Sequence, residues 1–285
     1  MLATGAAYPD ALSAAPLAGY YYAPILLTPS TSLAPAVANE LARLETEEIF
    51  VIGGTGAISE SVVNELTAMG LRVERLAGAN RYATSQAVAQ KLADLIGPLI
   101  GDTLLVARGD DFPDALAASP FAYQTHIPIL LTPPDMLPSG FNTKVTGLGF
   151  TDAIVMGGTG AISETVRGDI DILIPGPAVR VFGANRYETA VAFARYADTD
   201  PRWTGMYDDE YIGLAIGSNF PDALCGGAVC GSNYGPLLLT GPTSLPASVS
   251  TFIGEKSDTL AHVQAFGGTA VISDSVLAEV DALIP

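Results

Sequence analysis

Three aspartates occupy the same place in a motif that recurs along the chain. Each follows an aromatic residue and a proline and precedes Ala-Leu; they are Asp10, Asp114 and Asp222. A carboxylate in the first turn of a helix could act as a general base, or it could accept hydrogen bonds from the amides of its own turn. No histidine recurs beside these aspartates, and the chain contains no Gly-x-Ser-x-Gly motif. We therefore predict a structural role for the three aspartates and no catalytic residues.

Two arginines form a second repeated feature. Arginine and lysine together number only 13, yet Arg81 and Arg186 both stand in the sequence Gly-Ala-Asn-Arg-Tyr. Each is predicted to begin a helix capped by the preceding asparagine. A cation at this end opposes the helix dipole, so a negatively charged partner is expected. The preferred partner is one of the repeated aspartates, and the alternative is an anionic ligand. The candidate ligand-binding residues are Asn80, Arg81, Arg108, Asn185 and Arg186.

Each copy also has a Gly-Gly turn between an apolar run and a serine. In this setting, Gly54-Thr55-Gly56 has the pattern of a dinucleotide loop, whose glycines let phosphate approach a helix N-terminus. Serine, however, replaces the third glycine, and the acid expected about 20 residues later is Glu74 in the first copy but is absent from the second. We interpret the motifs as tight strand-to-helix turns with serine caps, formed by Gly53, Gly54, Ser59, Gly157, Gly158, Ser163, Gly267, Gly268 and Ser273.

The spacing of these motifs indicates an internal repeat. Equivalent residues lie 104 or 105 positions apart in the first two copies and 108 or 110 apart in the second and third. Self-similarity of this kind indicates repeated structural units. We predict modules at residues 1–98, 99–203 and 204–285. The first has a clipped start and the third lacks the last strand and helix, as expected of a fragment of a longer chain.

The second copy is the most complete and predicts the order of elements. Apolar, β-prone runs predict strands, and prolines, glycines and capping residues delimit the helices between them. The strands are predicted at 103–107, 128–132, 152–156 and 179–183, and the helices at 113–123, 141–148, after Ser163 and at 186–198. Alternating strands and helices indicate an α/β fold with a mostly parallel sheet, Rossmann-like or flavodoxin-like, in each module.

Composition limits the possible partners. The formal net charge is −17, which makes nucleic acid a poor partner because phosphate contacts need a basic surface. No apolar run is long enough to span a bilayer. The two cysteines, Cys225 and Cys230, are five apart on a predicted helix, which is too far for an unstrained disulfide. The two histidines are not spaced as metal ligands, so neither a metal nor a cofactor is predicted.

The repeated motifs together resemble the cell-wall-binding repeat type 2 family of Gram-positive surface proteins. The resemblance covers essentially the whole chain and rests on four pieces, which stand in the family's cyclic order. They are Phe112-Pro113-Asp114-Ala115-Leu116-Ala117, Pro128-Ile129-Leu130-Leu131-Thr132, Gly157-Gly158-Thr159-Gly160-Ala161-Ile162-Ser163 and Gly183-Ala184-Asn185-Arg186-Tyr187-Glu188-Thr189-Ala190.

The resemblance implies three tandem modules packed around a pseudo-threefold axis. It also implies an extracellular, non-enzymatic protein that anchors to an anionic wall polymer, teichoic-acid-like or a surface polysaccharide, with an effector domain elsewhere in a longer chain. The alternative function is a Rossmann-like nucleotide-binding protein or enzyme that uses the Gly-Gly-Thr-Gly turns.

Overall fold

The computed structural model describes residues 1–97 and 101–284, which form three parallel β-sheets covered by helices. The first sheet has the strand order β2-β1-β3-β4, the second β6-β5-β7-β8 and the third β10-β9-β11. The strands are β1 (Leu2–Thr4), β2 (Leu26–Thr28), β3 (Glu48–Ile52), β4 (Arg72–Leu76), β5 (Thr103–Arg108), β6 (Ile129–Thr132), β7 (Asp152–Met156), β8 (Ala178–Val181), β9 (Tyr211–Ile216), β10 (Leu237–Thr240) and β11 (His262–Phe266).

Helices connect the strands in the same order in each module. The first module contains η1 (Ala11–Ser13), α1 (Ala15–Tyr20), α2 (Pro35–Arg43), α3 (Glu60–Ala68) and α4 (Arg81–Ile96). The others contain α5 (Pro113–Thr125), α6 (Phe141–Leu148), α7 (Glu164–Leu173), α8 (Arg186–Thr199), α9 (Pro221–Ser232), α10 (Ala247–Glu255) and α11 (Asp274–Asp281).

The three sheets confirm the predicted α/β fold class. All strand pairs in the described residues are parallel, and the first strand of each module lies between its second and third. The chain therefore passes from the first strand to a neighbour on one side and then to a neighbour on the other side. This reversal makes a topological switch point at the carboxyl end of the first strand. The predicted module boundary at 98/99 lies outside the described residues.

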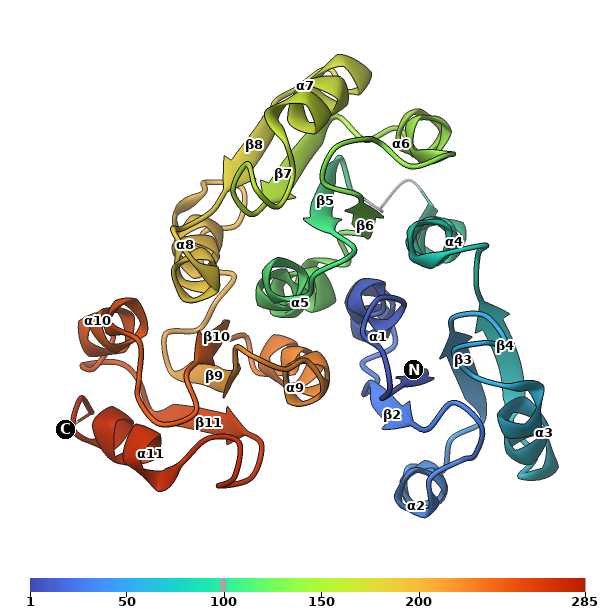
Figure 1. Ribbon diagram of the computed structural model, residues 1–285, viewed down its shortest axis with the longest axis horizontal. Helices are drawn as coiled ribbons and strands as arrows, with labels where there is room; N and C mark the ends of the chain where they lie inside the picture. The colour runs from blue at the N-terminus through green and yellow to red at the C-terminus, as the bar shows by residue number, and fades with distance from the viewer. Residues whose placement is uncertain (98–100, 285) are drawn as a thin grey trace.

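Three helices meet at the centre of the molecule, one from each module (Figure 1). These helices, α1, α5 and α9, pack against one another and follow the first strand of their own modules. Glycines permit the close approach, since a Cβ at Gly19 of α1 would lie 1.7 Å from the carbonyl oxygen of Tyr123 in α5. A Cβ at Gly227 of α9 would lie 2.0 Å from the hydroxyl of Ser119. One apolar core therefore runs through all three modules.

Two further helices link consecutive modules. Helix α4 follows the last strand of the first sheet but packs on β6 and α6 of the second module, and α8 in the same way packs on β10 and α10 (Figure 1). Ala89 of α4 belongs to the outer core of the second module, and Val191 of α8 to that of the third. The sequence modules and the packed units are therefore offset by one helix.

The first copy departs from the predicted helix pattern. The motif of Asp10 is followed by η1 and the short α1, whereas the second copy has one continuous helix, α5. In α5, Pro120 cannot donate to the Leu116 carbonyl, and the hydroxyl of Ser119 donates to it instead at 2.7 Å. Ala15 stands at the equivalent place in the first copy and has no hydroxyl.

Cys225 and Cys230 both lie on α9 and are free thiols, as their spacing predicts. Among the residues that the structure describes, no helix has the length and hydropathy required to cross a membrane.

The central packing leads to a first prediction. Gly19→Ala should lower the free energy of unfolding by about 1–3 kcal/mol, because the added methyl meets the backbone of α5, which cannot move aside as a side chain can. Gly168→Ala is the matched control, since a Cβ there in α7 meets nothing within 4 Å and alanine favours the helix by up to ~1 kcal/mol. Urea unfolding measures both. Equal stability of Gly19→Ala and the wild type would contradict close packing of α1 on α5.

Candidate functional site at the carboxyl ends of the strands

The loops that follow the strands of the second sheet enclose an open hollow of about 260 Å³. One side comes from the start of α5, with Asp111 and Asp114, and another from the Gly-Gly turn after β7. Asn185 and Arg186, at the start of α8, complete it. The hollow lies at the switch point between β5 and β7, where ligands of open α/β sheets bind.

The repeated aspartates contact the repeated glycines. A Cβ at Gly157 would lie 2.3 Å from the Oδ2 atom of Asp114, and a Cβ at Gly53 or Gly267 would lie 2.6 or 2.9 Å from the Oδ2 atom of the aspartate of its own module. These three glycines also have φ values of +93°, +104° and +123°, which side chains rarely adopt. The aspartate and the first glycine of each module thus pack as one unit. The second glycines have no such close contact, and each accepts hydrogen bonds from the turn that follows.

Asp114 has an unusual environment for a carboxylate. Burial, together with the negative charge of Asp111, raises the pKa of Asp114 to about 6, although Arg186, Arg108 and the Thr189 hydroxyl oppose the shift. A carboxyl group with this pKa can exchange a proton near neutral pH. The described surroundings, however, supply no recurring nucleophile or histidine beside it.

The repeated arginines contact the next module along the chain. Arg81 donates from Nη1 to the carbonyl oxygen of Gly109 at 2.8 Å, and Arg186 donates in the same way to Gly217. A Cβ at either glycine would lie 2.7 Å from the ring of the tyrosine that follows the arginine, Tyr82 or Tyr187 in turn. We call this arrangement the Arg–Tyr contact. It joins the start of α4 or α8 to the glycine that follows the first strand of the next module.

The predicted ion pair of these arginines with Asp10, Asp114 or Asp222 is therefore wrong, since the main contact of each arginine is a backbone carbonyl. Among the acidic residues that the structure describes, Asp111 lies nearest to Arg186, with 4.0 Å between its Oδ2 atom and the arginine Nη2 atom. A buried carbonyl satisfies a guanidinium without a carboxylate, because the oxygen carries partial negative charge and has two lone pairs.

The other candidate ligand-binding residues are held by local contacts. Asn185 accepts from the amides of Tyr187 and Glu188, and Asn80 accepts from Ala83, so both cap their helices as predicted. Arg108 forms a salt bridge with Asp110, which lowers the pKa of that carboxyl group. The arginines keep spare donors beyond these contacts, since a guanidinium has five.

The serine caps follow the prediction in one module. Ser163 accepts from the amide of Val166, as predicted. Ser59 and Ser273 stand at the same place but make no side-chain cap, which corrects the prediction for them. Each instead shares a hydrogen bond with the hydroxyl of the serine two residues later, at 2.6 and 2.7 Å, whereas the second module has Thr165 at that position.

The Gly-Gly turns are not arranged as phosphate loops. The amides of Ala161 and Ile162 donate to the carbonyl of Gly158, so they point into the turn rather than outward. Glu164 begins the following helix and pairs with Arg167 and Arg180. A carboxylate thus already occupies the helix end that a phosphate would need.

Two contacts escaped the sequence analysis. Arg75 and Arg180 each donate to the carbonyl of the first glycine in the Gly-Gly turn, both at 2.8 Å, and their spacing of 105 residues was the available signal. The aromatic residues before each Pro-Asp, which are Tyr8, Phe112 and Phe220, meet with ring centroids 5.4, 5.4 and 6.1 Å apart.

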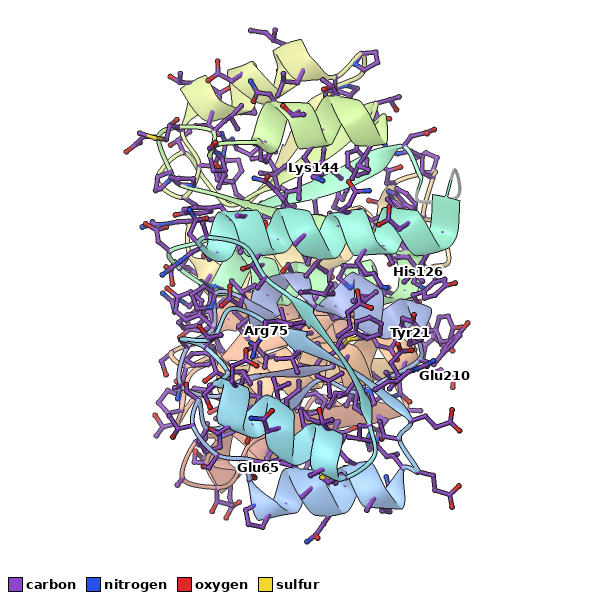
Figure 2. The ribbon with its side chains drawn as sticks, turned by 90° about the vertical axis from the view of Figure 1, so that its right-hand side faces the viewer. Tyr21, Glu65, Arg75, His126, Lys144 and Glu210 are labelled. Carbon is purple, nitrogen blue, oxygen red and sulfur yellow. The ribbon has the colours of Figure 1, made fainter. Side chains whose placement is uncertain are left out.

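This aromatic triad lies among the arginines. The guanidinium of Arg186 stands 5.6 Å from the ring centroid of Phe112, and the hydroxyl of Tyr8 donates to the carbonyl of Asp110, next to the contact of Arg81. Figure 2 places Tyr21, His126 and Glu210 toward its right-hand side, and Glu210 precedes strand β9, so this side is the face formed by the amino ends of the strands. The triad and the hollow therefore share the face formed by the carboxyl ends of the strands.

The motifs and the fold agree with a known family. The family model for cell wall binding domain 2 matches residues 1–63, 75–167 and 180–277. The chain belongs to this family. Each matched segment includes the first three strands of one sheet, one aspartate motif and one Gly-Gly turn. The predicted family and three-module architecture are thus confirmed, and the domain is a cell-wall-binding one.

Two curated relatives and two solved structures are similar to this chain. The chain is 30% identical over 272 residues to N-acetylmuramoyl-L-alanine amidase LytC of Bacillus subtilis, covering 95% of this chain and 51% of the amidase. It is 28% identical over 267 residues to the amidase enhancer of the same organism, covering 94% of this chain and 34% of that protein. The chain therefore spans about half of the amidase and about a third of the amidase enhancer.

Cwp6 from Clostridium difficile superposes with a TM-score of 0.89 at 26% identity, over 100% of this chain and 43% of that one. Cwp8 from the same organism has a TM-score of 0.83 at 22% identity, over 99% and 46%. The second likeness concerns the fold alone.

The pKa of Asp114 leads to a second prediction. A carboxyl group whose pKa is higher in the folded protein stabilises the folded state fully below its pKa in the unfolded chain, near 3.9. This stabilisation is lost as the pH rises from there through about 6, the pKa in the folded protein. The stability of the wild type relative to Asp114→Asn should therefore fall by about 2 kcal/mol between pH 4 and pH 7.5. Urea unfolding at a series of pH values measures this, with exposed Asp169→Asn as the surface control. A pH-independent difference would contradict the burial of Asp114.

The Arg–Tyr contact leads to a third prediction. Arg186→Ala should cost about 1.5–3 kcal/mol, because it removes a charged donor from the buried carbonyl of Gly217. Arg43→Ala is the control, since its side chain is 68% exposed and forms a surface ion pair with Glu40, so the change should leave stability nearly unchanged. Thermal or urea unfolding compares the two. If both variants behave alike, the contact between α8 and the third module does not contribute to stability.

Proposed function

We propose that this chain anchors a surface protein to the Gram-positive cell wall by binding an anionic wall polymer, teichoic-acid-like or a surface polysaccharide. The polymer lies on the face formed by the carboxyl ends of the strands. The chain itself is not an enzyme, and it acts outside the cell as part of a longer protein with an effector domain. Its family membership and its similarity to the amidase and the amidase enhancer support this proposal.

The proposed location of the polymer rests on the grouping of arginines beside the aromatic triad. Arg81 and Arg186 are fixed by the glycine carbonyls of the next module, so their remaining donors are pre-oriented at low entropic cost. The rings of Tyr8, Phe112 and Phe220 offer apolar area of the kind on which sugar rings stack. Phosphate or carboxylate groups of a polymer would meet the guanidinium groups beside those rings.

The charge of the chain restricts how an anion binds. The net charge of −17 repels a polyanion at long range, while screening limits this repulsion to about 10 Å at 0.1 M salt. Attraction must therefore come from direct contact. Module boundaries suit this, because the two arginines that lie there are held by backbone carbonyls of the next module.

The fourth prediction tests this location. The double variant Arg81→Lys/Arg186→Lys keeps the charge but loses the planar guanidinium, and it should bind wall fragments at least ~10-fold more weakly. Sedimentation with purified wall fragments measures binding, before and after the anionic polymer is stripped from them. The double variant Arg43→Lys/Arg72→Lys is the matched control, because both side chains are more than two-thirds exposed and pair with nearby glutamates.

Three outcomes decide between the possibilities. Loss of wild-type binding after stripping, together with weak binding by the Arg81/Arg186 variant, supports the proposal. Wild-type binding that survives stripping would exclude the anionic polymer as the ligand. Unchanged binding by a folded Arg81/Arg186 variant would place the ligand elsewhere on the domain.

A further inference from the structure

The second module places negative charge beside both repeated arginines. Asp110 and Asp111 directly follow Gly109, whose carbonyl oxygen accepts from Arg81. On the other side, the Oδ2 atom of Asp111 lies 4.0 Å from the Nη2 atom of Arg186. The two other copies have no acid at these positions, which are Ala6 and Ala7 in the first copy and Ser218 and Asn219 in the third.

The turn itself does not require the charge of Asp111. The Oδ1 atom of Asp111 accepts from the amide of Phe112 at 2.9 Å, and the Oδ1 atom of Asn219 accepts from the amide of Phe220 at 3.0 Å. An uncharged amide side chain therefore makes the same local contact in the third module. The negative charge of Asp111 calls for an explanation other than the shape of the turn.

Asp114 is the second carboxylate of the same hollow. Helix α8 packs on α5 (Figure 1), which brings Thr189 and Arg186 to Asp114. The Thr189 hydroxyl accepts from the amide of Gly183 at 3.1 Å, so its proton is free to reach the Asp114 carboxylate. On the other side, the Oδ2 atom of Asp114 packs against Gly157. The carboxyl group is thus enclosed by the residues that form the hollow.

The charged groups around Asp114 come from three elements. Asp111 precedes α5, Arg186 begins α8, and Arg108, at the end of β5, is paired with Asp110. A further arginine contacts the glycine beside Asp114 and is neutralised by its own acid, since Arg180 of β8 donates to the Gly157 carbonyl and pairs with Glu164.

The lining of the hollow carries an excess of negative charge. Asp111, Asp114 and Arg186 are its charged residues, so the fully ionised lining has a charge of −1. An anionic group that contacts Arg186 brings a further negative charge into about 260 Å³. Like charges this close favour the protonated form of one carboxyl group. Asp114 is the group that takes the proton, because burial and the charge of Asp111 already raise its pKa to about 6.

We propose that the anionic polymer binds this hollow together with one proton, which Asp114 takes up from solvent when an anionic group contacts Arg186. One O–H bond forms on Asp114, and the polymer undergoes no covalent change. The inference rests on the proposed function and adds its regulation, because wall binding becomes tighter as the pH falls. Asp111 sets the size of the effect, since its charge competes with the polymer for Arg186 and repels the charge of Asp114.

The pH dependence of wall binding is the fifth prediction. Affinity should be highest below about 6, the pKa of Asp114 in the free protein, and should fall as the pH rises above it. One close like charge makes the protonated form bind about 10-fold more tightly than the ionised form. Wild-type affinity for purified wall fragments should then be about 5-fold weaker at pH 7.5 than at pH 5.5, as measured by sedimentation.

Two variants assign this dependence to the hollow. Asp114→Asn should bind like the wild type at pH 5.5 and about 5–10-fold more tightly at pH 7.5, and the ratio at each pH cancels titration of the wall itself. Asp111→Asn, which has the side chain of Asn219, should also bind more tightly at pH 7.5, by about 2-fold or more, with a smaller pH dependence. Exposed Asp169→Asn is the control and should follow the wild type at both pH values.

Calorimetry counts the proton directly. Polymer released from the wall fragments is titrated into the protein at pH 6.5, in two buffers of different ionisation enthalpy. The wild type and Asp169→Asn should take up about 0.5 proton per site, and Asp114→Asn close to none. A purely structural role of Asp114 would not change this number.

The outcomes separate this inference from the proposed function. Wild-type binding that survives removal of the polymer would contradict the proposed function. Binding that is lost on stripping, with a ratio of Asp114→Asn to wild type that is equal at pH 5.5 and 7.5, would overturn the coupled proton and leave the proposed function standing. Should Asp114→Asn not fold, an Asp111→Asn variant with the affinity and pH dependence of the wild type would equally overturn it.

Discussion

Close contact among three helices is the constraint on which the rest of this structure depends. Helices α1, α5 and α9 approach so closely that Gly19, Gly227 and Gly231 cannot carry side chains without displacing their neighbours. Each of these helices covers its own sheet and also faces another module. The apolar surface of each module is therefore completed by the others, and the three share one central core in addition to the outer core of each module. The linking helices add to this dependence, because α4 and α8 complete the outer cores of the modules that follow them.

This packing also determines where functional side chains can meet. The loop after the first strand of each module leads into a central helix, so the three loops converge near the axis. Their aromatic residues, Tyr8, Phe112 and Phe220, consequently form one cluster although they are more than 100 residues apart in the chain. The arginines at the starts of α4 and α8 reach the same face, because their helices begin beside the first strand of the next module. A single module would carry neither the cluster nor a complete Arg–Tyr contact.

Much of the fold was predictable from local signals. Strand β7 and helix α6 have the predicted bounds, and Asn80, Asn185 and Ser163 cap their helices, because capping and strand formation depend on nearby residues. The partners of Arg81 and Arg186 were not predictable, since a backbone carbonyl has no sequence signature. The sequence also could not predict on which module α4 packs, because a helix buried between two units has residues buried on more than one face. The failed caps at Ser59 and Ser273 occur where a serine stands two residues later in place of Thr165 of the second copy, a difference that is visible only when the copies are compared position by position.

The same helix ends explain why the Gly-Gly turn of the second module leaves no free helix end for a phosphate. In a nucleotide-binding module, the glycine turn leaves the amides of the next helix free for phosphate. In this chain, Glu164 and its arginine partners occupy that end of α7, and Asp114 fills the space beside the first glycine of the turn. In the site proposed above, the groups that would meet an anion are guanidinium groups at the boundary between two modules, not backbone amides within one. Because Gly109 and Gly217 of the next module hold those guanidinium groups, the proposed anion contact requires both modules of each boundary.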